Sequence, residues 1–272
     1  MLLQTLPLRT ISMHEAAELF NRSFAGYFIS VQFTEDSFKA FVQRDDIDFD
    51  ASKILVANGK PAGLALIARR EKVSRLGGFG ITSVFRGQGA GTWLTGRLLE
   101  EARQRGETKM FLEVITRNEF AICLYEKHGF VRMRQLLGFK AENPTGNPDK
   151  ELVGCDQALV LDMLRTHGLP DLPWQVDAEK LSRVESSGYR LGDAFALISD
   201  PGAEHITLRS LVVPTESRGQ GQAIQLLKAL FAKFPGRNWH VPAIFPEELC
   251  SPFERAGMGQ EPLSQWQMVC KL

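Results

Sequence analysis

Apolar residues form two kinds of pattern along this chain, one typical of helices and one typical of strands. Apolar residues recur at intervals of three and four in Thr92–Arg103 and again in Ile224–Phe231, and this spacing predicts an amphipathic helix in each segment. A short apolar run precedes each helix, at Leu76–Val84 and at Ile206–Val213, and such runs are typical of buried strands. A glycine-rich loop lies between strand and helix in both places. The pattern therefore predicts strand, loop and helix twice in the same order.

The two loops and the segments beyond them repeat the same residues. Arg-Gly-Gln-Gly occurs at Arg86–Gly89 and again at Arg218–Gly221. Downstream, Leu124–Phe130 and Pro252–Met258 align with a Glu, a basic residue and a Gly in register. Because both motifs repeat in the same order and at nearly the same separation, they indicate a duplicated domain.

We therefore predict two domains, residues 1–142 and 157–272, joined by a linker at 143–156 whose start is rich in Pro, Gly and Asn. In the first domain, Asn58-Gly59 between two apolar runs predicts a β-hairpin. The second domain has its own hairpin-like segment at Tyr189–Ser199, turned by Asp200-Pro201-Gly202. The order of helices, antiparallel strands and then strand–loop–helix–strand–helix–strand predicts an α+β fold, with a mixed, largely antiparallel sheet flanked by helices in each domain.

The amino-acid composition argues against several classes of protein. Lys plus Arg and Asp plus Glu each number 32 in 272 residues, and this balance argues against a protein that coats nucleic-acid phosphates. No apolar stretch reaches the roughly 18 residues of a membrane helix, and no signal-peptide pattern opens the chain. The four cysteines form no CxxC pair, so we expect no metal site. We expect a cytoplasmic protein without nucleic-acid or membrane partners, for which an oligomer is possible but not indicated.

A glycine-rich turn between a strand and a helix leaves several backbone N–H groups pointing one way, beside the positive end of the helix. This arrangement is an anion site. The loop at Arg86–Gly91 lacks the Gly-Lys-Ser/Thr of a Walker loop and the spacing of the dinucleotide fingerprint. Taken alone, it is also compatible with a tight entry into a helix and no ligand.

The loop and the motif beyond it together resemble the GNAT superfamily of N-acetyltransferases. Val84–Gly91 is similar to that family's R/Q-x-x-G-x-G/A pyrophosphate loop, and Asn118–Phe130 to its N-x-x-A-x-x-L-Y-x-x-x-G-F motif, in the form seen in ribosomal-protein and N-terminal-amine acetyltransferases. The resemblance implies two tandem GNAT folds and acetyl-CoA as cosubstrate. The cofactor-binding residues that it implies are Ser83, Val84, Arg86, Gly87, Gln88, Gly89, Ala90, Gly91 and Asn118. For Asn118, capping of the following helix is the alternative.

Two residues of the first half match catalytic positions of the family. Tyr125 stands where the family places the proton donor to the departing thiolate, and a phenol remains protonated at neutral pH. Glu113, on the predicted strand Lys109–Ile115, stands where relatives have a base that acts directly or through water. The alternatives are that Tyr125 only packs on the cofactor and that Glu113 is a structural carboxylate. No His pairs with a Ser or Cys nucleophile, which favours direct transfer in a ternary complex.

The second half keeps the loop but departs from the motif where the chemistry lies. Phe253 stands in place of Tyr125, and Asn238–Ala243 has no counterpart of Glu113 or Asn118. We therefore expect the second domain to be degenerate. An acidic run, Asp45–Asp50, could attract a cationic amine, although such runs are more often solvated loops.

Three functions are compatible with these observations. The first is acetylation of a primary amine of a small molecule, which a groove narrowed by a second domain would favour. The second is acetylation of a protein α- or ε-amine, which the N-terminal-acetyltransferase form of the motif suggests. The third is a non-catalytic acetyl-CoA-binding or regulatory protein, which would make Tyr125 and Glu113 dispensable.

Overall fold

The computed structural model of the protein describes residues 1–272, which form two compact units. Unit 1 comprises Met1–Met133 and Trp266–Leu272, and unit 2 comprises Arg134–Gln265. These limits differ from the predicted domains 1–142 and 157–272. Most of the strand that ends the first repeat is counted with unit 2, and the last residues of the chain are counted with unit 1.

Unit 1 is built on a mixed sheet. Its strands, in spatial order, are β1 (Leu3–Pro7), β2 (Lys53–Ala57), β3 (Lys60–Arg70), β4 (Val73–Ile81), β5 (Lys109–Ile115) and the end of β12 (Gly259–Lys271). The strands β1 to β4 pair antiparallel, whereas β4 and β5 pair parallel. Asn58 and Gly59 both have positive φ in the β2–β3 turn, as the predicted hairpin requires.

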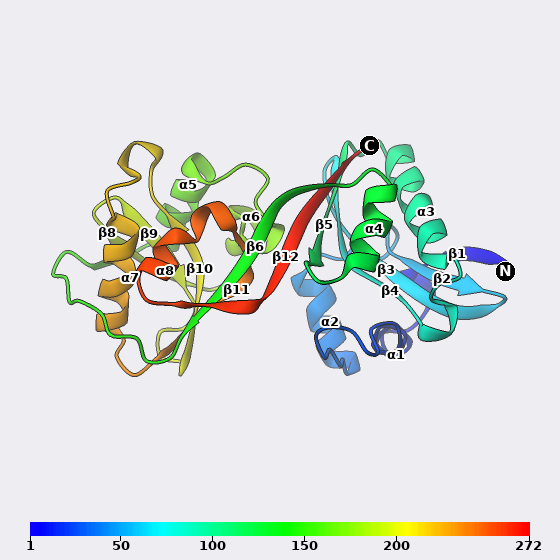
Figure 1. The fold of residues 1–272 in the computed structure, drawn as a ribbon, viewed down its shortest axis with the longest axis horizontal. Helices are drawn as coiled ribbons and strands as arrows, with labels where there is room; N and C mark the ends of the chain where they lie inside the picture. The colour runs from blue at the N-terminus through cyan, green and yellow to red at the C-terminus, as the bar shows by residue number, and fades with distance from the viewer. The chain divides into compact units, whose positions relative to one another are not determined.

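Helices cover both faces of this sheet (Figure 1). They are α1 (Met13–Ser23), α2 (Glu35–Arg44), α3 (Ala90–Gln104) and α4 (Glu119–Lys127), with short 3-10 turns η1 (Leu8–Thr10) and η2 (Ser83–Phe85). Side chains alternate along β4, so Gly78 and Gly80 face α1 while Phe79 and Ile81 face α3 and α4. The expected capping box is present, since Ser12 Oγ accepts from the Glu15 N–H and Glu15 Oε2 accepts from the Ser12 N–H.

Unit 2 repeats this architecture. Its strands, in spatial order, are the start of β12, then β6 (Val131–Ala141), β11 (Asn238–Pro246), β10 (His205–Val212), β9 (Ala194–Ile198), β8 (Ser187–Leu191) and β7 (Val153–Cys155). Only β10 and β11 are parallel among the pairs from β6 to β7. The hairpin expected at Tyr189–Ser199 is β8–β9, and it turns at Gly192-Asp193, whereas Asp200–Gly202 leads into β10.

The helices of unit 2 also occupy both faces of its sheet. They are α5 (Gln157–His167), α6 (Ala178–Leu181), α7 (Gln222–Lys233) and α8 (Ser251–Arg255), with 3-10 turns η3 (Trp174–Val176), η4 (Thr215–Ser217) and η5 (Glu247–Leu249). Phe195 and Leu197 pack with α5, while Ala194, Ala196 and Ile198 pack with α7 and α8. Each unit is therefore a largely antiparallel sheet flanked by helices, which confirms the predicted α+β class.

Candidate active site

The glycine loop of unit 1 presents an uncapped helix end to solvent. Gly87 and Gly89 have φ of 72° and 82°, and no atom lies within 4 Å of where a Cβ would stand on either residue. Gly89 is the N-cap of α3 and provides no side-chain hydrogen bond, so the N–H groups of the first turn have no side-chain cap. The helix begins at Ala90, two residues earlier than predicted, which brings its positive end into the loop itself.

The side chains of the loop stabilise it rather than face outward for a ligand. Arg86 donates from Nε to the carbonyl oxygen of Ile81 and from Nη2 to the carbonyl oxygens of Ser23 and Ala25. Gln88 Nε2 donates to the carbonyl oxygen of Val84 over 2.7 Å. Both side chains are thus engaged by the protein's own backbone, and the backbone N–H groups are the part of the loop available to an anion.

The parallel strands of unit 1 separate beside this loop. The β4–β5 pairs run from Val73–Lys109 to Leu76–Leu112 and stop there, and the β3–β4 register shifts at the same level. Beyond Leu76, β4 has a strand partner on one edge only, which leaves alternate backbone N–H groups of Gly77–Ile81 without a strand partner. The predicted strand ran to Val84, but the strand ends at Ile81, and Ser83 and Val84 lie in the η2 turn.

Tyr125 lies buried at this separation of the strands. Only 6% of the residue is exposed, and its ring packs against Phe79 and Phe130 with centroids 6.0 and 5.6 Å away. Burial raises the pKa of Tyr125, and the neighbouring Tyr27 raises it further. The hydroxyl is therefore protonated throughout the neutral range, as a proton donor must be.

A second tyrosine, which the sequence motifs did not single out, lies close to Tyr125. Tyr27 follows α1, and burial raises its pKa, an effect that the nearby Asn118 side chain partly offsets. Asn118 is the N-cap of α4, where Oδ1 accepts from the Ala121 N–H over 3.2 Å, so this residue caps the helix as the alternative predicted. No local motif marks Tyr27, because its partner Asn118 is far away in the sequence.

Glu113 is part of a buried ion pair. Arg75 donates to Glu113 Oε2 from Nε over 2.8 Å and from Nη2 over 2.7 Å, and Asp45 Oδ2 lies 3.5 Å from Nη1 of the same guanidinium. Burial alone would lower the pKa of Arg75, but the charge and hydrogen bonds of Glu113, together with Asp45, outweigh it and raise that pKa. Both contacts of Arg75 engage the same carboxylate oxygen of Glu113.

The acidic run Asp45–Asp50 is paired with arginines. The ion pairs are Asp45–Arg75, Asp46–Arg70, Asp48–Arg69 and Asp50–Arg9, with N···O distances between 2.7 and 3.8 Å. Three of these arginines come from β3 and β4. The run therefore ties the end of α2 and the chain after it to the sheet, which favours a structural role over attraction of a cationic amine.

Unit 2 keeps the loop geometry and lacks the hydroxyl. Gly219 and Gly221 both have φ of 79°, and Gly221 is the uncapped N-cap of α7. The β10–β11 pairing stops after Thr207–His240, so these strands separate as well. Phe253 is fully buried, with Phe139 and Phe245 at ring distances of 5.3 and 5.6 Å. The second unit thus repeats the geometry of the loop without a hydroxyl at the position of Tyr125.

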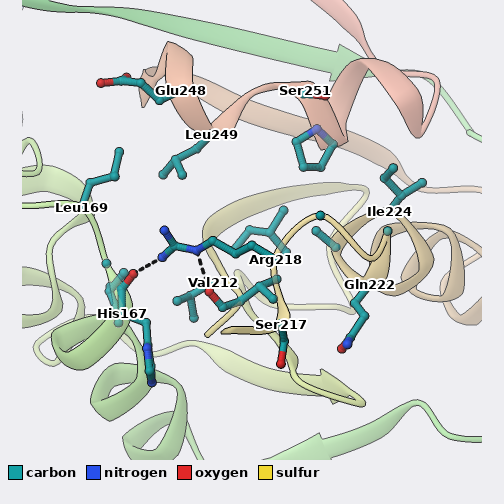
Figure 2. Close-up of a pocket in the computed structure, with 18 of the residues that line it drawn as sticks. His167, Leu169, Val212, Ser217, Arg218, Gln222, Ile224, Glu248, Leu249 and Ser251 are labelled. Carbon is teal, nitrogen blue, oxygen red and sulfur yellow. Dashed lines mark hydrogen bonds between the residues drawn. The ribbon is translucent and has the colours of Figure 1, made fainter. Parts of the chain in front are cut away.

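A cavity of about 280 Å³ lies beside the loop of unit 2. Its walls come from the end of α5, the end of β10, the start of α7, and the η5 and α8 turns. Figure 2 shows Arg218 lying across it, hydrogen-bonded to the carbonyl oxygens of His167 and Val213.

Comparison with known proteins agrees with this geometry. The sequence profile of the acetyltransferase (GNAT) family matches residues 13–130, within unit 1. An uncharacterized N-acetyltransferase of Methanocaldococcus jannaschii is 27% identical over 153 residues, a match that spans 51% of this chain and 66% of the relative.

Two solved structures share the fold over nearly the whole chain. A GCN5-related N-acetyltransferase of Sphaerobacter thermophilus has a TM-score of 0.70 at 16% identity and covers 99% of this chain and 95% of its own. A tandem GNAT protein from the clavulanic acid biosynthesis pathway has a TM-score of 0.64 at 13% identity and covers 99% and 98%. At these identities the similarity concerns the fold. No helix of the present structure has the length and apolar character needed to cross a membrane.

Proposed function

We propose that this chain, a tandem member of the GNAT family of acetyltransferases, uses unit 1 to transfer the acetyl group of acetyl-CoA to a primary amine. The observation that carries the proposal is the joint presence, in unit 1, of the uncapped loop at Arg86–Gly91 and the buried side chain of Tyr125, which packs on Phe79 beyond the last β4–β5 pair. Bound acetyl-CoA would supply an activated acetyl group as a thioester.

The residues of unit 1 fit such a cosubstrate. The N–H groups of Gly87–Gly91 offer donors to a diphosphate, and the open space beside Gly87 and Gly89 admits it. The unpaired edge of β4 from Gly77 to Ile81 offers a backbone N–H to a carbonyl oxygen. We propose that these β4 groups, rather than those of Ser83 and Val84, polarise the acetyl carbonyl, because Ser83 and Val84 lie in the η2 turn.

Tyr125 is proposed as the proton donor. Its raised pKa keeps the proton on Oη at neutral pH, and its position near the separation of β4 and β5 supports donation to the sulfur of the leaving group. Phe79 and Phe130 hold the ring from two sides, which fixes the direction of the hydroxyl.

Glu113 is proposed as the base, acting through water. Arg75 engages Glu113 through Oε2, and the carboxylate would take the amine proton through a bound water. The same ion pair also gives Glu113 a structural role, since it joins β4 to β5 at the last level where the strands pair. The effects of Glu113→Gln on stability and on rate distinguish the two roles.

The acceptor is proposed to be a small-molecule amine. The segment after α1 brings aromatic rings toward Tyr125, and the acidic run that would have attracted a polycation is neutralised by arginines. These features favour a small acceptor molecule that carries an amine and has apolar surface. A peptide α-amine is the second candidate, on the strength of the Asn118–Phe130 motif alone.

Release of coenzyme A over a panel of small amines and short peptides tests the proposal. We expect turnover with at least one small amine and its loss in Gly89→Glu, which places a carboxylate where the diphosphate would lie. Gly106→Glu is the matched control, because Gly106 has a φ of 77° and equally open surroundings but lies beyond the other end of α3. Turnover that survives Gly89→Glu, or that is lost equally in both variants, would contradict the assignment.

A further inference from the structure

The first strand of unit 1 has a free edge. β1 pairs antiparallel with β2 and ends the sheet, since no other strand pairs with it (Figure 1). The backbone groups of Leu2 and Leu8 are hydrogen-bonded to the residues at either end of β2, over 2.9 and 3.0 Å. Because these groups alternate in direction along an antiparallel strand, the N–H and C=O of Leu3 and Thr5 point away from β2 and have no strand partner.

This edge carries exposed apolar side chains and no charge. Leu2 and Leu6 are 75% and 40% exposed, and they lie with the exposed Gln4 on one face of β1. Residues 1–8 have no charged side chain. The strand at the same place in unit 2, β7, has three residues and is flanked by acidic ones. Short strands and charges protect sheet edges from pairing with other chains, and β1 lacks the charges.

The order of residues around Gln4 specifies how a second copy would pair with this edge. When two β1 strands pair antiparallel with Gln4 opposite Gln4, Leu2 lies opposite Leu6 of the second copy. Leu3 then lies opposite Thr5, and the outward N–H and C=O of these two residues exchange hydrogen bonds on both sides of the axis. The leucine side chains meet on one face, where opposite residues have Cβ atoms about 4.5–5.5 Å apart. The edge is therefore complementary to itself.

Other registers lose part of this complementarity. Pro7 also has its backbone turned outward, and it has no N–H. Pairing centred on Thr5 would place Leu3 opposite Pro7, so one hydrogen bond would be missing at each end. Pairing centred on Leu3 would leave Leu6 without an opposite residue. The register centred on Gln4 satisfies both the outward backbone groups and the exposed leucines.

We propose that the free edge of β1 is an interface with a second copy of this chain, in which two β1 strands pair antiparallel about a two-fold axis at Gln4. Each copy contributes one strand, so the buried area falls below the roughly 1,200 Å² of stable interfaces, and we expect a weak dimer with a Kd of about 1–100 μM. Three strands separate β1 from β5. The pairing is therefore independent of the function proposed for unit 1.

Oxidative cross-linking tests the register. Gln4→Cys would place two thiols opposite each other in a non-hydrogen-bonded pair with a Cα separation of about 4.5 Å, which a disulfide can span. We expect mild oxidation to convert this variant to a covalent dimer. Wild type, whose Cys123 is exposed, and Lys60→Cys, on the exposed start of β3, are the controls and should stay uncross-linked. If Gln4→Cys stays monomeric, or cross-links no faster than Lys60→Cys, the proposed register is wrong.

Sedimentation equilibrium between about 1 and 200 μM tests the dimer without a cross-link. Thr5→Pro removes an outward N–H and no bond to β2, and it should weaken the dimer by about tenfold or more. Thr5→Val, which keeps the N–H, is the matched control and should associate like wild type. A wild type that is monomeric throughout this range, or a dimer that Thr5→Pro leaves unchanged, overturns the proposal. Should Thr5→Pro not fold, Gln4→Glu decides, because it places two carboxylates together at the axis and should dissociate the dimer.

Discussion

Arg86 donates a hydrogen bond from Nη2 to the carbonyl oxygen of Ser23, the last residue of α1, over 2.8 Å. Unit 2 has the same contact, because Arg218 donates from Nη2 to the carbonyl oxygen of His167, the last residue of α5. In both units Nε of the arginine donates to a carbonyl five residues earlier. The arginine of the repeated tetrapeptide thus connects the loop to the end of a helix. It donates to carbonyl groups that have no hydrogen-bond partner within the helix.

This contact predicts the effect of Arg86→Met, which keeps the apolar stem and removes the donors. The loop would lose its attachment, so we expect the KM for acetyl-CoA to rise by about ten- to a hundredfold, the value of one or two hydrogen bonds from a charged donor. The rate constant kcat should change little. Steady-state kinetics measures both constants. Arg97→Met is the control, because it removes an exposed ion pair on α3. An unchanged KM would mean that the loop keeps its shape without Arg86.

The repeated sequence motifs made much of the fold predictable from the sequence. The tetrapeptides at Arg86 and Arg218 each lie between a strand and a helix, as the apolar spacing indicated, and the Asn58-Gly59 hairpin followed from local turn chemistry. The order of elements predicted a last strand in each repeat, but not the bounds of the long strands β6 and β12. Their alternation is interrupted by polar residues, and their neighbours in the sheet lie far away in the sequence, so no short window carries the signal.

The site was predictable only where a motif is local. The loop at Arg86–Gly91 and Tyr125 were found from the sequence because each belongs to a short pattern. The pairing of Arg75 with Glu113 and the contact of Tyr27 with Asn118 were not found, because sheet register and the path after α1 create them. A cavity cannot be derived from a repeat either, since it depends on which side chains fail to fill the space.

Glu113→Gln separates the structural role of Glu113 from its role as a base. Removing one charge of this buried pair should lower the free energy of unfolding by about 3 kcal/mol, because Arg75 is left buried without its partner. Glu100→Gln, which breaks an exposed pair with Arg97, should cost less than about 1 kcal/mol. Urea denaturation of both variants measures this difference.

The same variant, assayed well below its melting temperature, tests the base. If Glu113 takes the amine proton through water, kcat should fall by about a hundredfold or more in the folded variant. A variant that is destabilised but turns over at the wild-type rate would leave Glu113 with the structural role alone.

The raised pKa of Tyr125 predicts the shape of the pH profile. The rate should rise with pH through the pKa of the acceptor amine, because only the neutral amine reacts. A proton donor is lost above its own pKa, and burial moves that pKa above the ordinary value of about 10 for tyrosine. We therefore expect no falling limb from Tyr125 below about pH 10 in kcat/KM. A falling limb near pH 8 in wild type that is absent from Tyr125→Phe would contradict this.

Tyr27→Phe tests whether the contact with Asn118 competes with the cosubstrate. The resemblance implies that Asn118 binds the pantetheine arm, and Tyr27 holds the Asn118 side chain in the free protein. Removing the hydroxyl should tighten acetyl-CoA binding by about two- to tenfold, the value of one neutral hydrogen bond. Calorimetry against wild type measures the change. Weaker binding would mean instead that Tyr27 contributes to the cosubstrate site.

Tyr125→Phe tests the proton donor with the smallest change available. The ring contacts with Phe79 and Phe130 do not involve the hydroxyl, so the fold and the acetyl-CoA affinity should be nearly unchanged. A lost general acid typically costs about 10²–10⁴-fold in rate, and we expect kcat to fall within that range. Rapid-quench measurement of the first turnover ensures that the chemical step, and not product release, is compared.

Tyr189→Phe is the matched control, because Tyr189 lies in unit 2, packs on Phe234 and is given no role in transfer. It should turn over at the wild-type rate. Comparison of the two tyrosine variants therefore assigns the chemistry to one unit. If the turnover rate falls in Tyr125→Phe and not in Tyr189→Phe, the chemistry takes place in unit 1. If Tyr125→Phe is as fast as wild type with every accepted amine, the proton comes from elsewhere, and Tyr27, the other tyrosine in electrostatic contact with this position, is the residue to change next.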